Sequence, residues 1–159
     1  LKVLSYIATN RASFYGIDAF LKLADDFPEI DFSIAGYEHT SKVKLPANVK
    51  ALGWVDNMDE VFKENHVCLR FPEHDGLSVF ILESLARGKI VMYKYPFDCC
   101  IHCPDEKTLH EQMLSIIEEF NSDNWEGNSK AIEFIKENYS STKVYGTIVN
   151  ELKQIINAK

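Results

Sequence analysis

The segment HVCLRFPEHDGLSVFILESLARGKI, residues 66–90, is the stretch that indicates the fold of this chain. Residues His66–Phe71 carry Val, Cys, Leu and Phe in a run short enough to be a buried strand, and a polar loop follows. Ser78 is then suited to be the N-cap of a helix, and Gly88 to be its C′ residue. Because the strand-like run Ile90–Tyr93 comes next, the segment predicts a strand–helix–strand unit.

The same alternation of strands and helices continues on both sides of this segment. The other predicted strands are Lys2–Ala8, Asp31–Ala35, Val49–Trp54 and Cys99–His102. The predicted helices between them are one that starts near Ile17 and ends at Phe27-Pro28, and a short one through Lys63 that Asp56 caps. Apolar spacing beyond residue 103 predicts further helices, the last of which carries Val144, Ile148, Leu152, Ile155 and Ile156.

Strands separated by helices pair in parallel and need cover on both faces. The sequence therefore predicts an α/β fold, with a doubly wound, parallel, six-stranded Rossmann-like sheet, helices on both faces and extra C-terminal helices. The length of 159 residues suits one such domain, spanning residues 1–159. Because residue 1 is Leu and a strand begins directly after it, we expect the chain to be a segment of a longer protein.

Composition and charge exclude several classes of function. Seventeen Lys and Arg against 24 Asp and Glu give a net charge of −7, which argues against nucleic acid as a partner. No apolar run is long enough for a membrane span and no secretory leader is visible, so we expect a cytoplasmic location. Cys99, Cys100 and Cys103 cluster, but a structural zinc site needs four ligands and His102 lies within a predicted strand. We expect reduced thiols and no metal.

The polar loop before Ser78 is the predicted ligand site. In doubly wound folds ligands bind beyond the carboxyl ends of the strands, and here the loop leads into a helix. The unpaired amides at the helix start and the positive end of its dipole suit a phosphate. Gly76 lets the main chain approach that phosphate without a Cβ in the way.

Glu83, in the second turn of the same helix, is a candidate for ribose binding. It lies among apolar residues near the sheet side of the helix, and a carboxylate offers two acceptor oxygens for two neighbouring hydroxyls. An ordinary exposed helix glutamate would show the same pattern, and on periodicity alone both interpretations stay open.

The segment Asp75–Glu83 resembles the E-x7-E signature of retaining family-4 glycosyltransferases, with Asp75 in place of the first Glu. Three further stretches are similar to that family: Gly16-Ile17, Ile34–Gly36 and Leu45–Val55. The resemblance covers nearly the whole chain and rests on the order of these motifs. It implies a GT-B enzyme, in which two Rossmann-like domains face each other and the C-terminal one, this chain, holds the nucleotide-sugar donor. The N-terminal acceptor domain would lie outside this sequence.

The family resemblance also implies roles for single residues. Glu83 would bind the ribose hydroxyls and Asp75 the hydroxyls of the transferred sugar, and these two are the predicted catalytic residues. The amides of Gly76, Leu77 and Ser78 would face the diphosphate. The residues on the side of the base would be Gly36, Tyr37, Gly53, Trp54 and Val55. Neither a metal nor another cofactor would be needed, since cationic side chains and the helix dipole offset the charge of the leaving group.

The sequence departs from the family pattern at two positions. Tyr15 stands where the family usually has a basic residue before the glycine of the first loop. Arg11 and Arg70 are the cations predicted to supply the missing charge near the diphosphate, although a solvated loop arginine explains Arg11 as well. Asp75 is one methylene shorter than Glu, so the sugar preference is open to change.

The resemblance implies a hexosyltransferase of bacterial polysaccharide biosynthesis. It would transfer a hexosyl group from a nucleoside-diphosphate sugar to a saccharide or lipid-linked acceptor, with retention of configuration. The full-length enzyme would be cytoplasmic, with peripheral association at the inner face of the membrane, and this segment alone would be inactive. Two alternatives stay open: a catalytically degenerate nucleotide-sugar-binding module and a related GT-B nucleotide-sugar epimerase.

Overall fold

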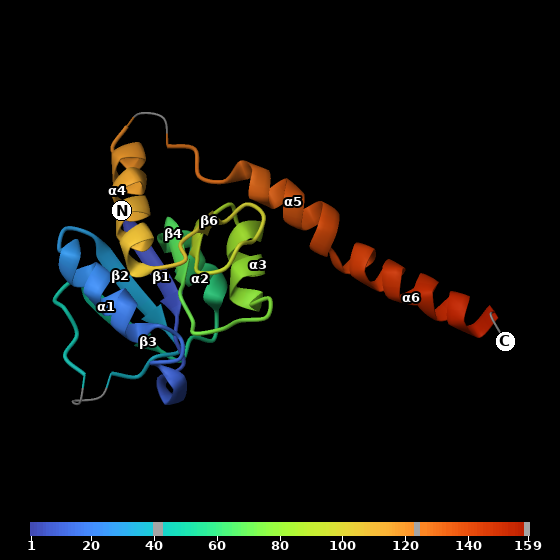
Figure 1. The fold of residues 1–159 in the computed structure, drawn as a ribbon, viewed down its shortest axis with the longest axis horizontal. Helices are drawn as coiled ribbons and strands as arrows, with labels where there is room; N and C mark the ends of the chain where they lie inside the picture. Colours follow the sequence, from blue (N-terminus) through green and yellow to red (C-terminus); the bar gives the residue numbers. More distant parts are fainter. Residues whose placement is uncertain (40–42, 123–124, 158–159) are drawn as a thin grey trace.

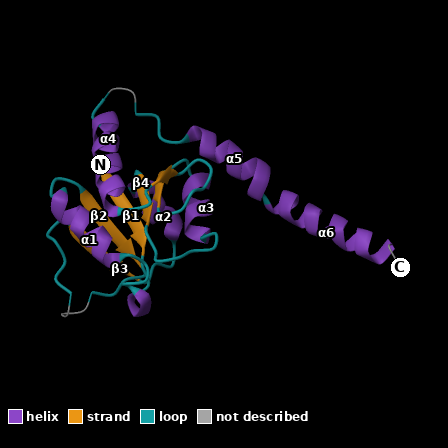
Figure 2. Cartoon of the chain, in the orientation of Figure 1, coloured by secondary structure: helices purple, strands orange, loops and turns teal. Residues whose placement is uncertain are grey.

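The computed structural model describes residues 1–39, 43–122 and 125–157 and contains one six-stranded parallel sheet (Figures 1 and 2). The strand order is β3-β2-β1-β4-β5-β6, and every pair of neighbours is parallel. The strands are β1 (Lys2–Tyr6), β2 (Asp31–Ala35), β3 (Val49–Gly53), β4 (Val67–Arg70), β5 (Ile90–Tyr93) and β6 (Ile101–His102). This is the predicted Rossmann-like sheet.

Helices follow the strands in the predicted alternation. Their bounds are η1 (Thr9–Arg11, a short 3₁₀ helix), α1 (Ile17–Asp26), α2 (Met58–Glu64), α3 (Val79–Ala86), α4 (Glu106–Phe120), α5 (Ser129–Tyr139) and α6 (Ser141–Asn157). Ser78 occupies the N-cap position of α3, and Gly88 follows the C-cap with a φ of +66°, both as predicted. The extra C-terminal helices α5 and α6 are also confirmed.

The structure differs from the sequence prediction at several element ends. Asn57, rather than Asp56, caps α2, because its side chain accepts the amide hydrogen of Asp59. Asp56 instead accepts from the indole nitrogen of Trp54. The first strand ends at Tyr6 because the 3₁₀ helix η1 begins soon after it, and the last strand keeps only two residues.

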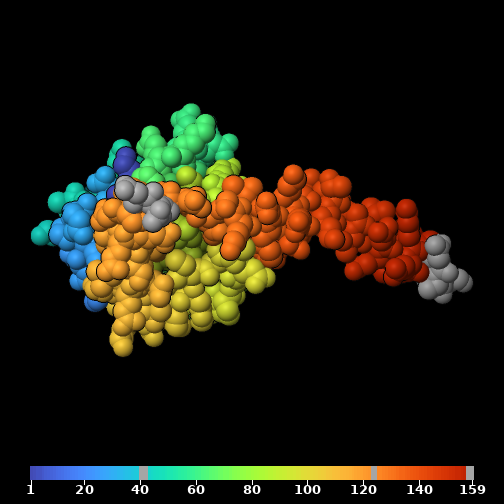
Figure 3. Space-filling model, turned by 90° about the horizontal axis from the view of Figure 1, so that it is seen from above, coloured from blue at the N-terminus to red at the C-terminus, as the bar shows by residue number. Residues whose placement is uncertain are grey.

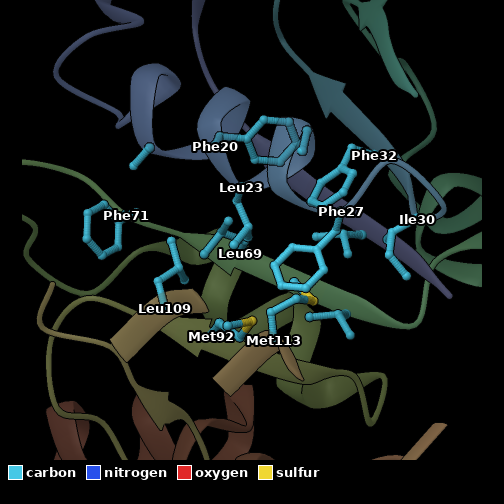
Figure 4. Close-up of a cluster of buried hydrophobic side chains, with 14 of the residues drawn as sticks. Phe20, Leu23, Phe27, Ile30, Phe32, Leu69, Phe71, Met92, Leu109 and Met113 are labelled. Carbon is cyan, nitrogen blue, oxygen red and sulfur yellow. The ribbon is translucent and has the colours of Figure 1, made fainter. Parts of the chain in front are cut away.

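Two apolar layers hold the helices to the two faces of the sheet. On one face, α1 and α4 pack on alternate strand residues, including Phe32, Leu69 and Met92 (Figure 4). The rings of Phe20 and Phe32 meet there edge to face, with centroids 5.4 Å apart. On the other face, α2 and α3 pack on the remaining residues of the same strands, such as Leu4 and Val91, and α5 packs on α3. Burial on both faces is what a parallel sheet requires, and it fixes the register of each strand.

The order of the strands places the site. From β1 the chain runs outward through β2 and β3, and β4 then starts the other half of the sheet on the opposite side of β1. The loops that follow the carboxyl ends of β1 and β4 therefore run in opposite directions. Ligands of such folds bind between them, at this topological switch point.

The helices α5 and α6 form an arm that leaves the body of the domain (Figures 1 and 3). α5 is held by the buried side chain of Ala131 and by Phe134, which meets Phe97. The residues of α6 from Ser141 to Ile156 are all exposed. Its large apolar residues are Val144, Tyr145, Ile148, Val149, Leu152, Ile155 and Ile156. Within the described residues, no helix is both long enough and apolar enough to cross a membrane.

Candidate functional site

The loops that follow β1 and β4 are joined at the switch point through Gly16. This glycine has a φ of +78°, and a Cβ there would lie 2.1 Å from the carbonyl oxygen of Phe71. The amide of Glu73 donates to the carbonyl of Phe14 at 2.8 Å, and the Phe14 ring meets the His74 ring edge to face. Only glycine permits this close approach. The two loops consequently form a single wall of the site.

Arg70 and Asp75 form an ion pair inside that wall. The Arg70 Nε donates to the Asp75 Oδ2 at 3.0 Å, with side chains only 7% and 13% exposed. The Arg70 Nη1 also donates to the carbonyl of Tyr6 at 3.2 Å. As a cation at the end of a core strand, Arg70 is expected to need an anionic partner. In the structure Asp75, the predicted sugar-binding residue, is that anion.

Tyr15, at the position of the missing basic residue, lies against the same arginine. The guanidinium carbon of Arg70 is 4.6 Å from the centroid of the Tyr15 ring, within the range of a cation–π contact. The structure thus brings a cation from β4 next to the position where the family pattern places a cation on the first loop. Tyr15 and Asp75, the two residues that depart from the family pattern, therefore lie in one cluster with Arg70.

Two tyrosine hydroxyls, one from the last residue of β5 and one from the segment after it, support the loop between β4 and α3. Tyr93 donates to the carbonyl of Gly76 at 3.3 Å, and Tyr95 donates to the carbonyl of Glu73. Burial, aided by the nearby Asp75 carboxylate, raises the pKa of Tyr93 to about 12, so that its hydroxyl keeps its proton and remains a donor. These two contacts fix the path of the chain through the loop.

The start of α3 retains its capacity to bind an anion. Ser78 has N-cap geometry, but its side chain makes no capping hydrogen bond to the helix. Gly76 and Leu77 are exposed, and a Cβ on Gly76 would meet open space. The first turn of α3 contains no acidic residue that would occupy the positive end of the dipole. An anion at this end would find backbone amides, a hydroxyl and the helix dipole.

Glu83 is half-buried on α3, at the border of the buried stripe formed by Phe80, Ser84 and their neighbours. Arg87 lies one turn later and would be the natural ion-pair partner of the Glu83 carboxylate. Its guanidinium instead pairs with Asp59 of α2, and it contacts Glu83 through the backbone carbonyl and not through the side chain. In the described part of the chain the Glu83 carboxylate has no hydrogen-bond or ion-pair partner. The two carboxylate oxygens of Glu83 are therefore free to accept hydrogen bonds from a ligand.

A small open cleft lies at the carboxyl ends of β1, β2 and β3, and two of the predicted base-side residues, Gly36 and Trp54, line it. The cleft has a volume of about 290 Å³ and is lined by Tyr6, Ala8, Thr9, Asn10, Gly36, Glu38 and Trp54. Trp54 is 75% exposed. The side chain of Tyr37, by contrast, is only 2% exposed and packs in the core, so Tyr37 offers this side no more than its backbone. The Gly53 amide donates to the Tyr37 carbonyl. Val55 is half-buried and packs against the core cluster that contains Leu4.

Arg11 lies at the end of η1, on the same edge of the sheet. It is exposed and pairs with no carboxylate among residues 1–39, 43–122 and 125–157. Of the two cations predicted to serve the diphosphate, it is therefore the one whose charge is not already neutralised.

Other parts of the molecule offer less chemistry. A larger cleft of about 430 Å³ lies between α2 and the β2–β3 edge, lined by residues that include Lys2, Asp31 and Asn65. None of the predicted site residues lines it, and it opens at the amino ends of the strands. Within the described residues, no group of three His, Cys, Asp or Glu side chains could hold a metal ion. Burial raises the pKa of the Cys68, Cys100 and Cys103 thiols to about 12, which makes them poor nucleophiles.

The sequence did not predict how the loop between β4 and α3 is held. Gly16, Tyr93 and Tyr95 support the loop without belonging to its motif. Tyr93 ends β5, the strand next to β4, and Tyr95 follows it; parallel strands bring their carboxyl ends to one side of the sheet. That rule could have placed Tyr93 and Tyr95 near the loop. It does not tell whether a tyrosine anchors the loop through its hydroxyl or packs its ring in the core.

No protein-family model and no curated protein matches the sequence. Solved structures match well in fold. A glycosyltransferase from Rickettsia africae is 11% identical with a TM-score of 0.81, over 99% of this chain and 48% of that one. TarM of S. aureus is 16% identical with a TM-score of 0.74, over 94% of this chain and 34% of TarM.

Two further structures bear on the domain and the ligand. The C-terminal domain of LpcC, a group 1 glycosyl transferase from Francisella tularensis, is 10% identical with a TM-score of 0.61, covering 88% of this chain and 85% of that domain. HepE of Anabaena, solved with UDP-glucose, is 11% identical with a TM-score of 0.74, covering 96% of this chain and 48% of HepE. The chain thus spans about a third to a half of the TarM, Rickettsia and HepE chains. At these identities the likeness shows a shared fold.

Proposed function

We propose that this chain is the donor-binding domain of a glycosyltransferase and binds a nucleoside-diphosphate sugar at the start of α3. The observation that carries this proposal is the combination of an uncapped helix start and the unpartnered carboxylate of Glu83 on one helix beside the switch point. The shared fold with glycosyltransferases supports it, including HepE, which was solved with UDP-glucose and with UDP.

The chemistry of the site divides along the ligand. The diphosphate would accept hydrogen bonds from the amides of Gly76, Leu77 and Ser78, and the helix dipole would stabilise the charge that develops on the leaving group. Arg11 would add a positive charge from the opposite loop. Glu83 would accept from the two ribose hydroxyls, which explains why its carboxylate is left without a protein partner.

Asp75 is the proposed contact for hydroxyls of the transferred sugar, but it shares its carboxylate with Arg70. The ion pair fixes the position of Asp75 and reduces its freedom to follow the sugar, so its role is that of a rigid acceptor. Sugar transfer with retention, a hexosyl donor and a saccharide or lipid-linked acceptor are the remaining parts of the proposal. The acceptor would bind a second domain in a GT-B arrangement, and transfer would need no metal.

Titration calorimetry with UDP, GDP and ADP, free and as sugar conjugates, tests the proposal. We expect binding of at least one diphosphate, and weaker binding of the corresponding monophosphate because the helix start loses one charged group. Glu83→Gln should weaken binding about tenfold, the loss of one hydrogen bond to a charged group. Glu133→Gln on the exposed face of α5 is the matched control and should leave binding unchanged. Absence of heat with every diphosphate would overturn the donor-site assignment.

A catalytically degenerate nucleotide-sugar-binding module is the second candidate. The ion pair between Arg70 and Asp75 favours it, because it engages both a predicted cation and a predicted catalytic carboxylate within the protein. Turnover by the full-length enzyme distinguishes the two. Transfer that is lost on Glu83→Gln supports the enzyme, whereas donor binding without transfer to any saccharide or lipid-linked acceptor supports the module.

A further inference from the structure

The cleft at the ends of β1, β2 and β3 presents a fixed aromatic face to solvent. Trp54 is 75% exposed, and its indole nitrogen donates to the Asp56 Oδ1 at 2.9 Å. The hydrogen bond satisfies the polar atom of the ring and restrains its orientation, and the apolar faces remain uncovered. Such an aromatic ring suits stacking by a second flat ring, and stacking of a base on an aromatic side chain tolerates any base.

Glu38 lines the same cleft, and its side chain ends in a carboxylate. Its amide donates to the Thr9 Oγ1 at 2.8 Å, and the Thr9 hydroxyl donates in turn to the carbonyl of Gly36. These bonds tie the backbone at Glu38 to the loop that follows β1. No side-chain hydrogen bond or ion pair of Glu38 is present within the part of the chain that the structure describes.

The cleft lies on the far side of the switch point from α3. Tyr6, Gly36 and Trp54 follow or end β1, β2 and β3, whereas α3 follows β4 on the other half of the sheet. A ligand whose diphosphate binds at α3 and which spans the switch point would place its base in this cleft. This step rests on the function proposed above.

We propose that Glu38 selects guanine and that the donor is a guanosine-diphosphate sugar whose base stacks on Trp54. A carboxylate is an acceptor with two oxygens and needs two adjacent donors to be fully engaged. Guanine presents such a pair on its Watson–Crick edge, the ring N1–H and the exocyclic amino group. Uracil offers one N–H flanked by two carbonyl oxygens that would repel the carboxylate. Adenine and cytosine place a ring nitrogen lone pair beside their amino group.

Calorimetric titration of GDP, UDP, ADP and CDP into the protein tests this assignment. We expect GDP to bind at least tenfold more tightly than UDP. Glu38→Gln should weaken GDP about tenfold and leave UDP unchanged, because the amide replaces one acceptor by a donor. Glu29→Gln is the control. Glu29 is exposed and lies before β2, at the amino ends of the strands, so this variant should keep the preference for GDP over UDP.

The stacking part of the proposal has its own measurement. GDP should quench the fluorescence of Trp54, and Trp54→Ala should weaken all four nucleotides by a similar factor. Trp125, which packs on Phe120, provides the control, since Trp125→Phe should leave the quenching intact.

The outcomes separate this inference from the function on which it rests. UDP, ADP or CDP binding as tightly as GDP, or a GDP preference that survives Glu38→Gln, overturns the guanine assignment and leaves the donor site standing. Failure of every nucleoside diphosphate to bind overturns both. Circular dichroism confirms that the variants fold, which is expected because Glu38 and Trp54 are exposed.

Discussion

At the scale of single residues, Arg70 and Asp75 show how a site motif also serves the fold. Both were predicted to contact the donor, and the structure joins them in an ion pair that is almost fully removed from solvent. In such surroundings the pair contributes little net stability, but either charge alone is expensive. The loop between β4 and α3 therefore depends on both partners being present.

Removing one partner should show this dependence. Arg70→Met leaves the Asp75 carboxylate buried without a partner, so we expect a loss of about 3 kcal/mol in the free energy of unfolding. Chemical denaturation measures this loss. The double variant Arg70→Met/Asp75→Leu should recover most of it. If the effects of the two single changes simply add, the pair is not the cause.

Tyr93 gives a second prediction at this scale, with a defined pH dependence. Tyr93→Phe removes the hydroxyl that donates to Gly76 and should cost about 1 kcal/mol at neutral pH. The folded-state pKa of Tyr93 is raised from 10 to about 12, so its contribution is complete below pH 10 and is lost as the pH rises toward 12. Wild type should therefore be more stable than Tyr93→Phe at pH 8, and this advantage should disappear between pH 10 and pH 12. A wild-type advantage that persists at pH 12 would contradict the assignment.

The residues of the site differ in how far sequence could predict them. Ser78 and Glu83 follow from helix capping, helix periodicity and the family resemblance, and both occupy the predicted positions on α3. The ion pair of Asp75 with Arg70 does not follow from the sequence, because a cation at a strand end is equally suited to bind an anionic ligand. Two charges five residues apart across a loop can meet or diverge, and the loop path that decides this is set by tertiary contacts.

At the scale of elements, Gly16 controls how the loop after β1 meets the loop after β4. Gly16→Ala would place a methyl group 2.1 Å from the Phe71 carbonyl oxygen in addition to its positive φ. We expect a loss of several kcal/mol in the free energy of unfolding, within the upper range for single substitutions. Gly53→Ala is the matched control, because Gly53 also has a positive φ but its Cβ would meet nothing within 4 Å.

Gly53→Ala should cost only the left-handed backbone strain, about 1 kcal/mol. Thermal unfolding of the two variants separates the cost of the backbone strain from the cost of the clash with the Phe71 carbonyl. Equal losses would mean that backbone strain alone acts and that the two loops are not pressed together at Gly16.

The interiors of the elements were predictable, as were both ends of α3, but other ends were not. Buried parallel strands leave short continuous apolar runs, and amphipathic helices leave a periodic apolar stripe. The cap of α2 is decided between two adjacent residues, Asp56 and Asn57, that are both good caps. The indole of Trp54 binds Asp56 and so leaves the cap to Asn57, a contact outside the reach of local patterns.

At the scale of the whole molecule, strand alternation was sufficient to predict the parallel sheet. The position of the switch point follows from topology, since it lies between β1 and β4 whatever the loop sequences are, and the proposed site is at this point. The joining of the loops after β1 and β4 did not follow, because their contacts link residues such as Phe14 and Glu73 that are distant in sequence.

The arm formed by α5 and α6 yields a prediction at the same scale. The described side chains of α6 are exposed, so its removal takes away almost no buried apolar surface. A chain ending at Ser140 should therefore unfold within about 2 °C of the full chain, since less than about 1 kcal/mol is at stake. A chain ending at Asn128 should melt much lower, because it loses Ala131 and the contact between Phe134 and Phe97. A large drop on removing α6 alone would contradict this description of the arm.

The central claim is that the start of α3 holds a diphosphate. The most direct test is a ¹H–¹⁵N correlation spectrum of the chain titrated with GDP and with UDP. We expect the amide signals of Gly76, Leu77 and Ser78 to shift in a saturable manner, together with the indole N–H of Trp54. Shifts confined to the cleft beside Lys50 and Asn65, or no shifts with either nucleotide, would contradict it.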